Sequence, residues 1–240
     1  MPIRNRRPDL NGLLVVDKPL GWSSAKVCAH VRRVSGGAKV GHAGTLDPLA
    51  TGVLVVALGR ATKAIAGIQA TEKRYVAEVD LSAFTDTDDA EGEREEIEVA
   101  ALPGGEVIEA ALRSHFTGAI EQTPPVFSAI KLDGERAYRM ARRGDREAAI
   151  AKLEARTVTI HEIALTAYAW PIAALDIRCS KGTYIRSLAR DLGRVLGTGG
   201  TLASLRRTAV GEYTIDRAVT PGDLPEPMTP GDVMPVPIGL

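Results

Sequence analysis

The 240-residue sequence has only two cysteines and no long hydrophobic run, and both features narrow the classes of protein to which it can belong. No apolar stretch reaches the roughly 18 residues of a membrane-spanning helix, so no membrane segment is expected. Two cysteines, Cys28 and Cys179, cannot supply a disulfide framework or a four-ligand zinc site. No apolar core follows the basic start MPIRNRRPDL, so we expect no export signal and a cytoplasmic location.

Several common catalytic motifs are also missing. The sequence holds neither GxxxxGK[ST] nor GxGxxG, so it lacks these phosphate- and dinucleotide-binding loops. The stretch Gly21–Ala25 lacks the second glycine of a serine-hydrolase nucleophile elbow. The four histidines do not have the spacing of metal ligands, and the acidic segment 85–105 does not match a calcium-binding loop. No metal site is therefore expected.

The net charge is zero, but the charges are unevenly distributed along the chain. Residues 1–60 carry nine Lys or Arg against three Asp or Glu, whereas residues 78–109 carry twelve acids against one base. Residues 131–217 are basic again, with sixteen bases against ten acids. Two basic blocks favour a polyanionic partner, because neutralising phosphates releases counterions. Solvated surface charge is the equally weighted alternative.

Hydrophobic periodicity predicts alternating strands and helices. Strands are expected at 12–17, 53–58, 74–81, 156–169 and 173–179, and helices at 24–33, 61–68, 107–116 and 183–196. In the last of these helices, Arg186, Arg190 and Arg194 are expected on the outer face. Several strands follow one another as antiparallel neighbours, which favours an α+β fold over a doubly wound parallel sheet.

Three further segments are not expected to form regular elements. Residues 85–105 are predicted to be a solvated loop or hairpin tip, and residues 1–10 a basic tail. The last twenty residues contain six prolines, which predict an extended tail with no packed element over 218–240. The region between these tails, 11–217, is expected to form one domain.

The stretch GHAGTLDPLATG, residues 41–52, contains one carboxylate, Asp47. Asp before Pro commonly starts a turn, so Asp47 on its own is expected to be structural. However, Gly41, Gly44 and Gly52 allow the backbone to approach a ligand closely, and a buried strand is predicted to follow. This context makes Asp47 a candidate for catalysis.

The motif GHAGTLDPLATGVL closely resembles the catalytic motif of the TruB-type tRNA pseudouridine synthases. Five further stretches resemble other motifs of that family, in the family's order and spanning about 11–217: KPLGWSS, KRY, TDTDDAEG, QTPPVFSAIKLDGERAYRMARRG and CSKGTYIRSLARDLG. The resemblance implies the pseudouridine synthase fold, which has a mostly antiparallel mixed sheet with flanking helices and loops and a central active-site cleft.

The resemblance also implies an isomerase that converts a uridine in the T loop of tRNA, at position 55, to pseudouridine. Cleavage of a glycosidic bond develops positive charge at the sugar C1′, which a carboxylate can stabilise or attack. An isomerase that retains its base needs no second acid, and this reaction needs no cofactor or metal. The implied partner is the T stem-loop of tRNA, with no membrane and no guide RNA, and a monomer is expected.

The resemblance assigns roles to individual residues of this sequence. Asp47 would attack the sugar or the ring or assist a glycal-like route, and Arg186 would pair with Asp47 and orient it. Tyr75 would stack on the target base. The implied substrate-binding residues are His42, Tyr184, Leu205 and Lys18, of which Lys18 is equally compatible with a structural role. The uridine must leave its stack to reach Asp47, so base flipping is expected. Basic residues of 26–39 and 131–146 would follow the phosphates.

The sequence departs from the family pattern in a few places. Ser23 replaces the usual Thr, Phe127 replaces Tyr, and Ser82-Ala83-Phe84 replaces a Gly-containing run. Family members often carry an RNA-binding PUA domain at the C-terminus, which is expected to be missing or vestigial here. The main alternative function is a non-catalytic tRNA-binding or tRNA-folding chaperone on the same scaffold. A guide-RNA-dependent synthase and a nucleoside glycosidase are two further alternatives.

Overall fold

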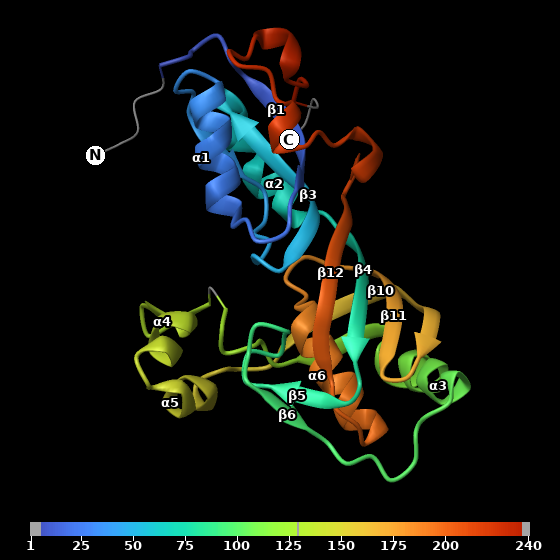
Figure 1. Ribbon diagram of the computed structural model, residues 1–240. Coiled ribbons are helices and arrows are strands. Elements are labelled where there is room, and N and C mark those ends of the chain that lie inside the picture. The colour runs from blue at the N-terminus through green and yellow to red at the C-terminus, as the bar shows by residue number, and fades with distance from the viewer. Residues whose placement is uncertain (1–5, 129, 237–240) are drawn as a thin grey trace. The chain divides into compact units, whose positions relative to one another are not determined.

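The computed structural model describes residues 6–128 and 130–236, and the chain forms two compact units (Figure 1). The first unit comprises Met1–Tyr75 and Leu205–Leu240, and the second comprises Val76–Ser204. Two strands, β4 and β12, run from one unit into the other.

Parts of both predicted tails lie outside the described residues, and the described helices can be examined for membrane-spanning length. Residues 1–5 of the predicted basic tail and residues 237–240 of the predicted proline-rich tail lie outside the described residues. Over the described ranges, no helix is both long enough and apolar enough to cross a membrane.

The first unit is built around strand β3. Its elements are β1 (Gly12–Lys18), α1 (Ser24–Val34), β2 (Val40–His42), β3 (Ala50–Leu58), η1 (Gly59–Ala64), α2 (Ile65–Ala70), β13 (Tyr213–Thr214) and η2 (Ile215–Arg217). Strand β1 pairs antiparallel with β3 along one edge. The other edge of β3 pairs with β12 (Thr201–Val210) in parallel at its start and with β2 antiparallel at its end.

Strand β3 is buried on both faces, which explains its continuous apolar sequence. Leu54, Val56 and Leu58 face one hydrophobic cluster, to which α1 contributes Val27, Val31 and Val34. Val53, Val55 and Ala57 face a second cluster, to which α2 contributes Ile68. The helices therefore cover opposite faces of β3, as side chains that alternate along a strand require.

The second unit contains the following strands and helices, of which β4 begins in the first unit. These are β4 (Lys73–Asp80), β5 (Ala83–Thr85), β6 (Arg94–Glu96), α3 (Gly105–His115), β7 (Gly118–Gln122), β8 (Lys131–Leu132), β9 (Glu135–Arg136), α4 (Ala137–Arg142), α5 (Arg146–Ala151), β10 (Arg156–Ala169), β11 (Ile172–Cys179) and α6 (Ile185–Leu196). The strand order from β12 is β12-β4-β11-β10-β7, and β10 pairs antiparallel with both neighbours. The sheet is mixed and mostly antiparallel, so the predicted α+β class is confirmed.

Several predicted elements are confirmed closely. Strand β4 alternates as expected, with Tyr75, Ala77 and Val79 buried and Glu78 exposed. Strand β10 and helix α6 lie within two residues of their predicted bounds. Helix α1 begins after Ser23, whose side chain accepts a hydrogen bond from the backbone N–H of Lys26 at 3.1 Å.

Two predictions about surface exposure hold for most of their residues but are wrong at a few. Residues 85–105 do contain a hairpin, β5–β6, but Asp88 and Asp89 in its turn are not solvated, and Asp89 is only 3% exposed. On α6 the predicted outer face is also wrong at its start, because Arg186 is 6% exposed. The two errors have one cause: the acids of this turn pair with the arginines of this helix.

The proline-rich segment 218–236 packs against the first unit, although the prolines gave no indication of this. Two short 3-10 turns, η3 (Pro221–Asp223) and η4 (Pro230–Asp232), interrupt it. Leu224 and Met228 enter the cluster beneath α1, where Met228 is 1% exposed. Backbone hydrogen bonds join the segment to the edge of β1 that β3 does not use.

Candidate active site

Asp47 lies in the loop between β2 and β3 of the first unit. The side chain is half-buried, and the backbone turns here because Ala50 N–H donates to the Asp47 carbonyl at 3.1 Å. Gly44 and Gly52 have φ values of +98° and +97°, which side-chain-bearing residues rarely adopt. The two glycines thus set the path of the chain on either side of Asp47.

A buried lysine holds this loop from the side of β1. Lys18 is fully buried, and its ammonium donates to the backbone carbonyls of Pro19 at 3.0 Å, Trp22 at 2.5 Å and Pro48 at 3.4 Å. Gly21 N–H also donates to the Pro48 carbonyl, at 2.8 Å. These bonds join the residue that follows Asp47 to the turn after β1, which supports the structural alternative for Lys18.

Helix α1 and strand β12 hold the loop from two further sides. Ser24 Oγ accepts from Leu46 N–H at 2.8 Å and lies 3.0 Å from the Leu46 carbonyl. Arg207 on β12 is 2% exposed, and its guanidinium donates to the carbonyls of Gly44 and Val53 at 3.1 and 2.7 Å. Asp47 is therefore carried by a loop whose backbone is fixed before and after it.

His42 and Leu205 flank the same loop. His42 is half-buried on β2, and its Nδ1 is buried with no hydrogen-bond partner among the described residues. Burial lowers the pKa of His42, and the nearby charge of Arg207 acts in the same direction, whereas the backbone of Gly44 acts in the opposite direction. The pKa stays below its ordinary value, so the ring is neutral near pH 7. Leu205 is half-buried on β12, opposite Ala50 in the parallel pairing with β3.

In the second unit, Arg186 is fixed at the start of α6. Its Nη1 lies 3.2 Å from Asp89 Oδ2 and donates to the Thr87 carbonyl at 3.3 Å, while its Nη2 donates to the Phe127 carbonyl at 2.9 Å. Asp89 in turn accepts from Thr87 Oγ1 at 2.6 Å and from Glu91 N–H at 3.1 Å. The guanidinium thus has a defined orientation within its own unit.

A second ion pair lies one helical turn further along α6. Arg190 Nη1 is 2.9 Å from Asp88 Oδ2, and Arg190 also pairs with Asp191 and donates to the Thr123 carbonyl. Burial raises the pKa of Asp88, although Arg190 and Arg186 act in the opposite direction. Asp88 adopts a φ of +62°, so the turn itself places its carboxylate toward α6.

Tyr184 precedes α6 and is held by its backbone. Its N–H donates to Gln122 Oε1 at 2.8 Å, and its carbonyl accepts from Gln122 Nε2 at 3.1 Å. The Arg156 guanidinium lies over the Tyr184 ring, 4.7 Å from its centroid. The ring position is therefore linked to the start of β10.

Family models match most of the chain. The TruB family pseudouridylate synthase (N terminal domain) model matches residues 32–185, and the tRNA pseudouridylate synthase B C-terminal domain model matches residues 186–229. The chain belongs to the TruB family. Its members are pseudouridylate synthases, so the chain is an enzyme of the isomerase class.

Similar proteins carry the same description. A tRNA pseudouridine synthase B of Thermobifida fusca (strain YX) is 47% identical over 237 residues, which cover 94% of this chain and 77% of that protein. One of Arthrobacter sp. (strain FB24) is 49% identical, covering 90% of this chain and 71% of that protein. The chain is thus shorter than these TruB relatives.

Solved structures confirm the fold. A chain of a Cbf5-Nop10-Gar1 complex superposes with a TM-score of 0.67 at 28% identity, covering 91% of this chain and 54% of that chain. A chain of the archaeal box H/ACA sRNP Nop10-Cbf5 complex gives 0.65 at 28% identity, covering 93% of this chain and 58% of that chain. The TruB chain therefore spans little more than half of these two solved chains.

The residues predicted for the TruB site fall in both units. Five of them belong to the first unit: Asp47, His42, Lys18, Leu205 and the mostly buried Tyr75. The loop of Asp47 follows the strand of His42 and is bonded to Lys18. Arg186 and Tyr184 belong to the second unit. The pairing of Asp47 with Arg186 and the central cleft stay predictions.

The family motifs include three residues to which the sequence assigned no role and which hold predicted site residues in place: Asp88, Asp89 and Arg207. A signal for the first two was present, because two adjacent aspartates in TDTDDAEG can match two arginines spaced four apart on α6. Nothing in the sequence indicated that Arg207 is buried, because its neighbour Arg206 has the same side chain and is half-exposed.

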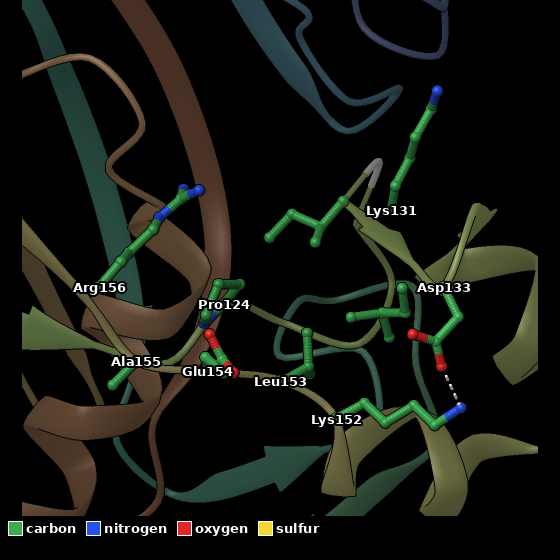
Figure 2. Close-up of a pocket in the computed structure, with 10 residues that line it drawn as sticks. Pro124, Lys131, Asp133, Lys152, Leu153, Glu154, Ala155 and Arg156 are labelled. Carbon is green, nitrogen blue, oxygen red and sulfur yellow. Dashed lines mark hydrogen bonds and ion pairs between the residues drawn. The ribbon is translucent and has the colours of Figure 1, made fainter.

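A pocket of about 550 Å³ lies in the second unit, and its lining includes Arg156, which also lies over the Tyr184 ring (Figure 2). Lys131 and Arg156 extend from opposite walls, and Lys152 pairs with Asp133 at 2.7 Å. None of the predicted site residues lines this pocket. Among the described residues, no group of three or more His, Cys, Asp or Glu side chains is placed to hold a metal ion.

Proposed function

We propose that the chain converts the uridine at position 55, in the T loop of tRNA, to pseudouridine, with Asp47 as the catalytic residue. The bond between C1′ and N1 breaks, the base rotates, and a bond between C1′ and C5 forms. The proton at C5 leaves to solvent and N1 gains one, so the product is an isomer of the substrate. Asp47 stabilises or attacks the carbon from which the base departs, and it is released at the end.

The observation that carries this proposal is the rigid, glycine-flanked loop around one half-buried carboxylate. Lys18, Ser24 and Arg207 fix its backbone through hydrogen bonds to Pro48, Leu46 and Gly44. A reactive group held in this way meets the substrate without first having to be ordered. A pure RNA-binding chaperone would not need such a carboxylate.

Arg186 and Tyr75 complete the proposed catalytic group. A guanidinium carries five N–H donors, so Arg186 can bind Asp47 as well as Asp89. The ion pair with Asp89 would hold the plane of Arg186 ready for this second contact. Tyr75 would stack on the flipped uracil, and His42, Tyr184 and Leu205 would line its pocket.

The proposed partner is the T stem-loop of a cytoplasmic tRNA, bound by a monomer without a guide RNA. The relatives described as tRNA pseudouridine synthase B are 46–49% identical, whereas the matching chains from H/ACA complexes are 26–28% identical. This difference favours a stand-alone enzyme over a guide-dependent one.

Tritium release tests the proposal. Unmodified tRNA carrying tritium at uridine C5 is incubated with the wild-type protein and with Asp47→Asn. We expect one tritium released per tRNA by the wild type and none by the variant, which keeps the shape of the side chain. Equal release by both proteins would exclude Asp47, free uracil would indicate a glycosidase, and tight binding without release would support the chaperone.

A further inference from the structure

We propose that Arg207 is a positioning residue for Asp47: its buried guanidinium ties the start of the loop that carries this carboxylate to strand β3, which follows the loop. The inference rests on the proposed catalytic role of Asp47. In this proposal Arg207 makes no contact with the reacting atoms and acts only through the backbone that it binds.

The contacts of Arg207 span the loop. Nη2 donates to the Gly44 carbonyl at 3.1 Å and Nη1 to the Thr45 carbonyl at 3.4 Å, both shortly before Asp47. Nε donates to the Val53 carbonyl at 2.7 Å, after Asp47. Because the guanidinium is planar and rigid, it fixes the distance between these carbonyls.

The burial of this cation needs a specific reason. Arg207 is 2% exposed, and within the described part of the chain its hydrogen bonds go to backbone carbonyls and none to a carboxylate. Burying a charge without a counter-charge is costly. The hydrogen bonds to these three carbonyls offset the cost of burying the cation. An apolar side chain of similar size would leave the same carbonyls without this donor.

The backbone of Arg207 constrains the same loop. Arg207 pairs with Gly52 in the parallel register of β12 and β3. A Cβ at Gly52 would collide with the Arg207 carbonyl oxygen, so the two backbones meet without room for a side chain. The backbone of Arg207 therefore fixes the start of β3 after the loop, while its side chain joins the start of the loop to the same strand.

The preceding residue offers a matched control. Arg206 has a half-exposed side chain that pairs with Asp17 at 2.7 Å. A solvent-accessible pair of this kind contributes little to stability. Replacing each arginine with lysine thus makes the same chemical change at adjacent positions, but only Arg207→Lys removes the three-point contact with the loop.

The test compares wild type, Arg207→Lys and Arg206→Lys on the tritiated T stem-loop, with melting temperatures from circular dichroism. A lysine at 207 keeps the charge but cannot donate along three directions of a plane. We expect kcat to fall about 100-fold for Arg207→Lys with KM within about twofold, since small misplacements of a reactive group are this costly. Arg206→Lys is expected to keep the wild-type kcat.

Hydrogen exchange gives a second measurement that does not depend on activity. In Arg207→Lys the amides of Leu46 and Ala50, which are bonded within the loop, should exchange faster, while those of α1 stay protected. An unchanged kcat, or a rise in KM alone, would overturn the inference. So would failure of both Arg207→Lys and Arg207→Gln to fold, because Arg207 would then serve the whole unit.

The result also separates this inference from the proposed function. If the wild type releases no tritium, the proposed function itself fails. If the wild type and Arg207→Lys release tritium equally while Asp47→Asn does not, the proposed function stands and only the positioning role is lost.

Discussion

Arg186 Nη1 lies 3.2 Å from Asp89 Oδ2, and less than a tenth of either side chain is exposed. One helical turn later, Arg190 and Asp88 repeat the arrangement at 2.9 Å. The turn of the β5–β6 hairpin is thus joined to α6 by two adjacent ion pairs. The proposed partner of Asp47 is already oriented by residues of its own unit, so less ordering is required when substrate binds.

The first prediction is that Asp89→Asn weakens both stability and catalysis. The variant keeps the size of the side chain but removes the buried counter-charge that lies 3.2 Å from Arg186 Nη1. Losing one partner of a buried pair costs about 3–5 kcal/mol. We expect the free energy of unfolding to fall by about that amount in urea titrations, and kcat for tritium release to fall at least about tenfold.

The control for this prediction is an exposed ion pair on α3. Glu109 pairs with Arg113 at 3.3 Å, and both side chains are exposed. Glu109→Gln should change the free energy of unfolding by about 0.5 kcal/mol or less. If Asp89→Asn costs no more than Glu109→Gln, the buried pair does not have the importance assigned to it.

The second prediction concerns the pH dependence that Asp88 gives to stability. Burial raises the pKa of Asp88 in the folded chain, so the folded state holds its proton more tightly than the unfolded state does. The contribution of Asp88 to stability therefore decreases as pH rises from about 4, the unfolded value, through the raised folded pKa. Above that value it changes no further.

Urea titrations of the wild type and Asp88→Asn at several pH values measure this contribution. Asparagine also tolerates a positive φ, so the turn at Asp88 (φ +62°) is retained. We expect the stability of the variant relative to wild type to increase with pH across this window. A decrease would mean that Arg190 and Arg186 outweigh burial at this carboxylate.

Elements with a clear local period could be predicted from the sequence. Strand β4 alternates, α6 carries an apolar stripe, and β3 is a continuous apolar run, so each has a pattern set by its own neighbours in the chain. The packing of Met228 could not be predicted, because prolines exclude a regular element but do not exclude burial. Its position depends on α1, far away in the sequence.

The candidate site was only partly predictable for a related reason. Motifs identified Asp47, Tyr75 and Arg186, but charged residues are expected at the surface unless a partner is known. Lys18 and Arg207 are buried against backbone carbonyls, and Asp89 against an arginine 97 positions later. Contacts of this kind join residues far apart in the sequence, so the local sequence pattern does not predict them.

The third prediction is that the segment after Arg217 protects β1 and, through it, the loop of Asp47. Val219 exchanges backbone hydrogen bonds with Val15 and Asp17, and Met234 exchanges two with Leu13, all between 2.8 and 2.9 Å. Truncation after Arg217 would leave this edge of β1 unpaired, and unpaired edges promote association. We expect a lower melting temperature, aggregation in size-exclusion chromatography and reduced activity.

A shorter truncation after Val236 is the control, because it retains all of these bonds. It should remain monodisperse and active. If the longer truncation behaves in the same way, the pairing with β1 does not protect the strand.

The fourth prediction is that α1 binds RNA phosphates through Lys26 more than through Arg33. Lys26 is exposed and lies 4.4 Å from the centre of the Trp22 ring, and no carboxylate pairs with it in the described part of the chain. Arg33, on the same helix, already pairs with Glu226 at 2.6 Å. A cation that an acid already neutralises releases fewer counterions when RNA binds.

Binding of the T stem-loop is measured from about 50 to 300 mM salt for the wild type, Lys26→Ala and Arg33→Ala. Each phosphate contact contributes about 0.7–0.9 to the slope of log K against log salt. Lys26→Ala should reduce the slope by about that amount, and Arg33→Ala by clearly less. Equal reductions would mean that RNA displaces Glu226 from Arg33, and an unchanged slope for Lys26→Ala would remove this helix from the phosphate-binding surface.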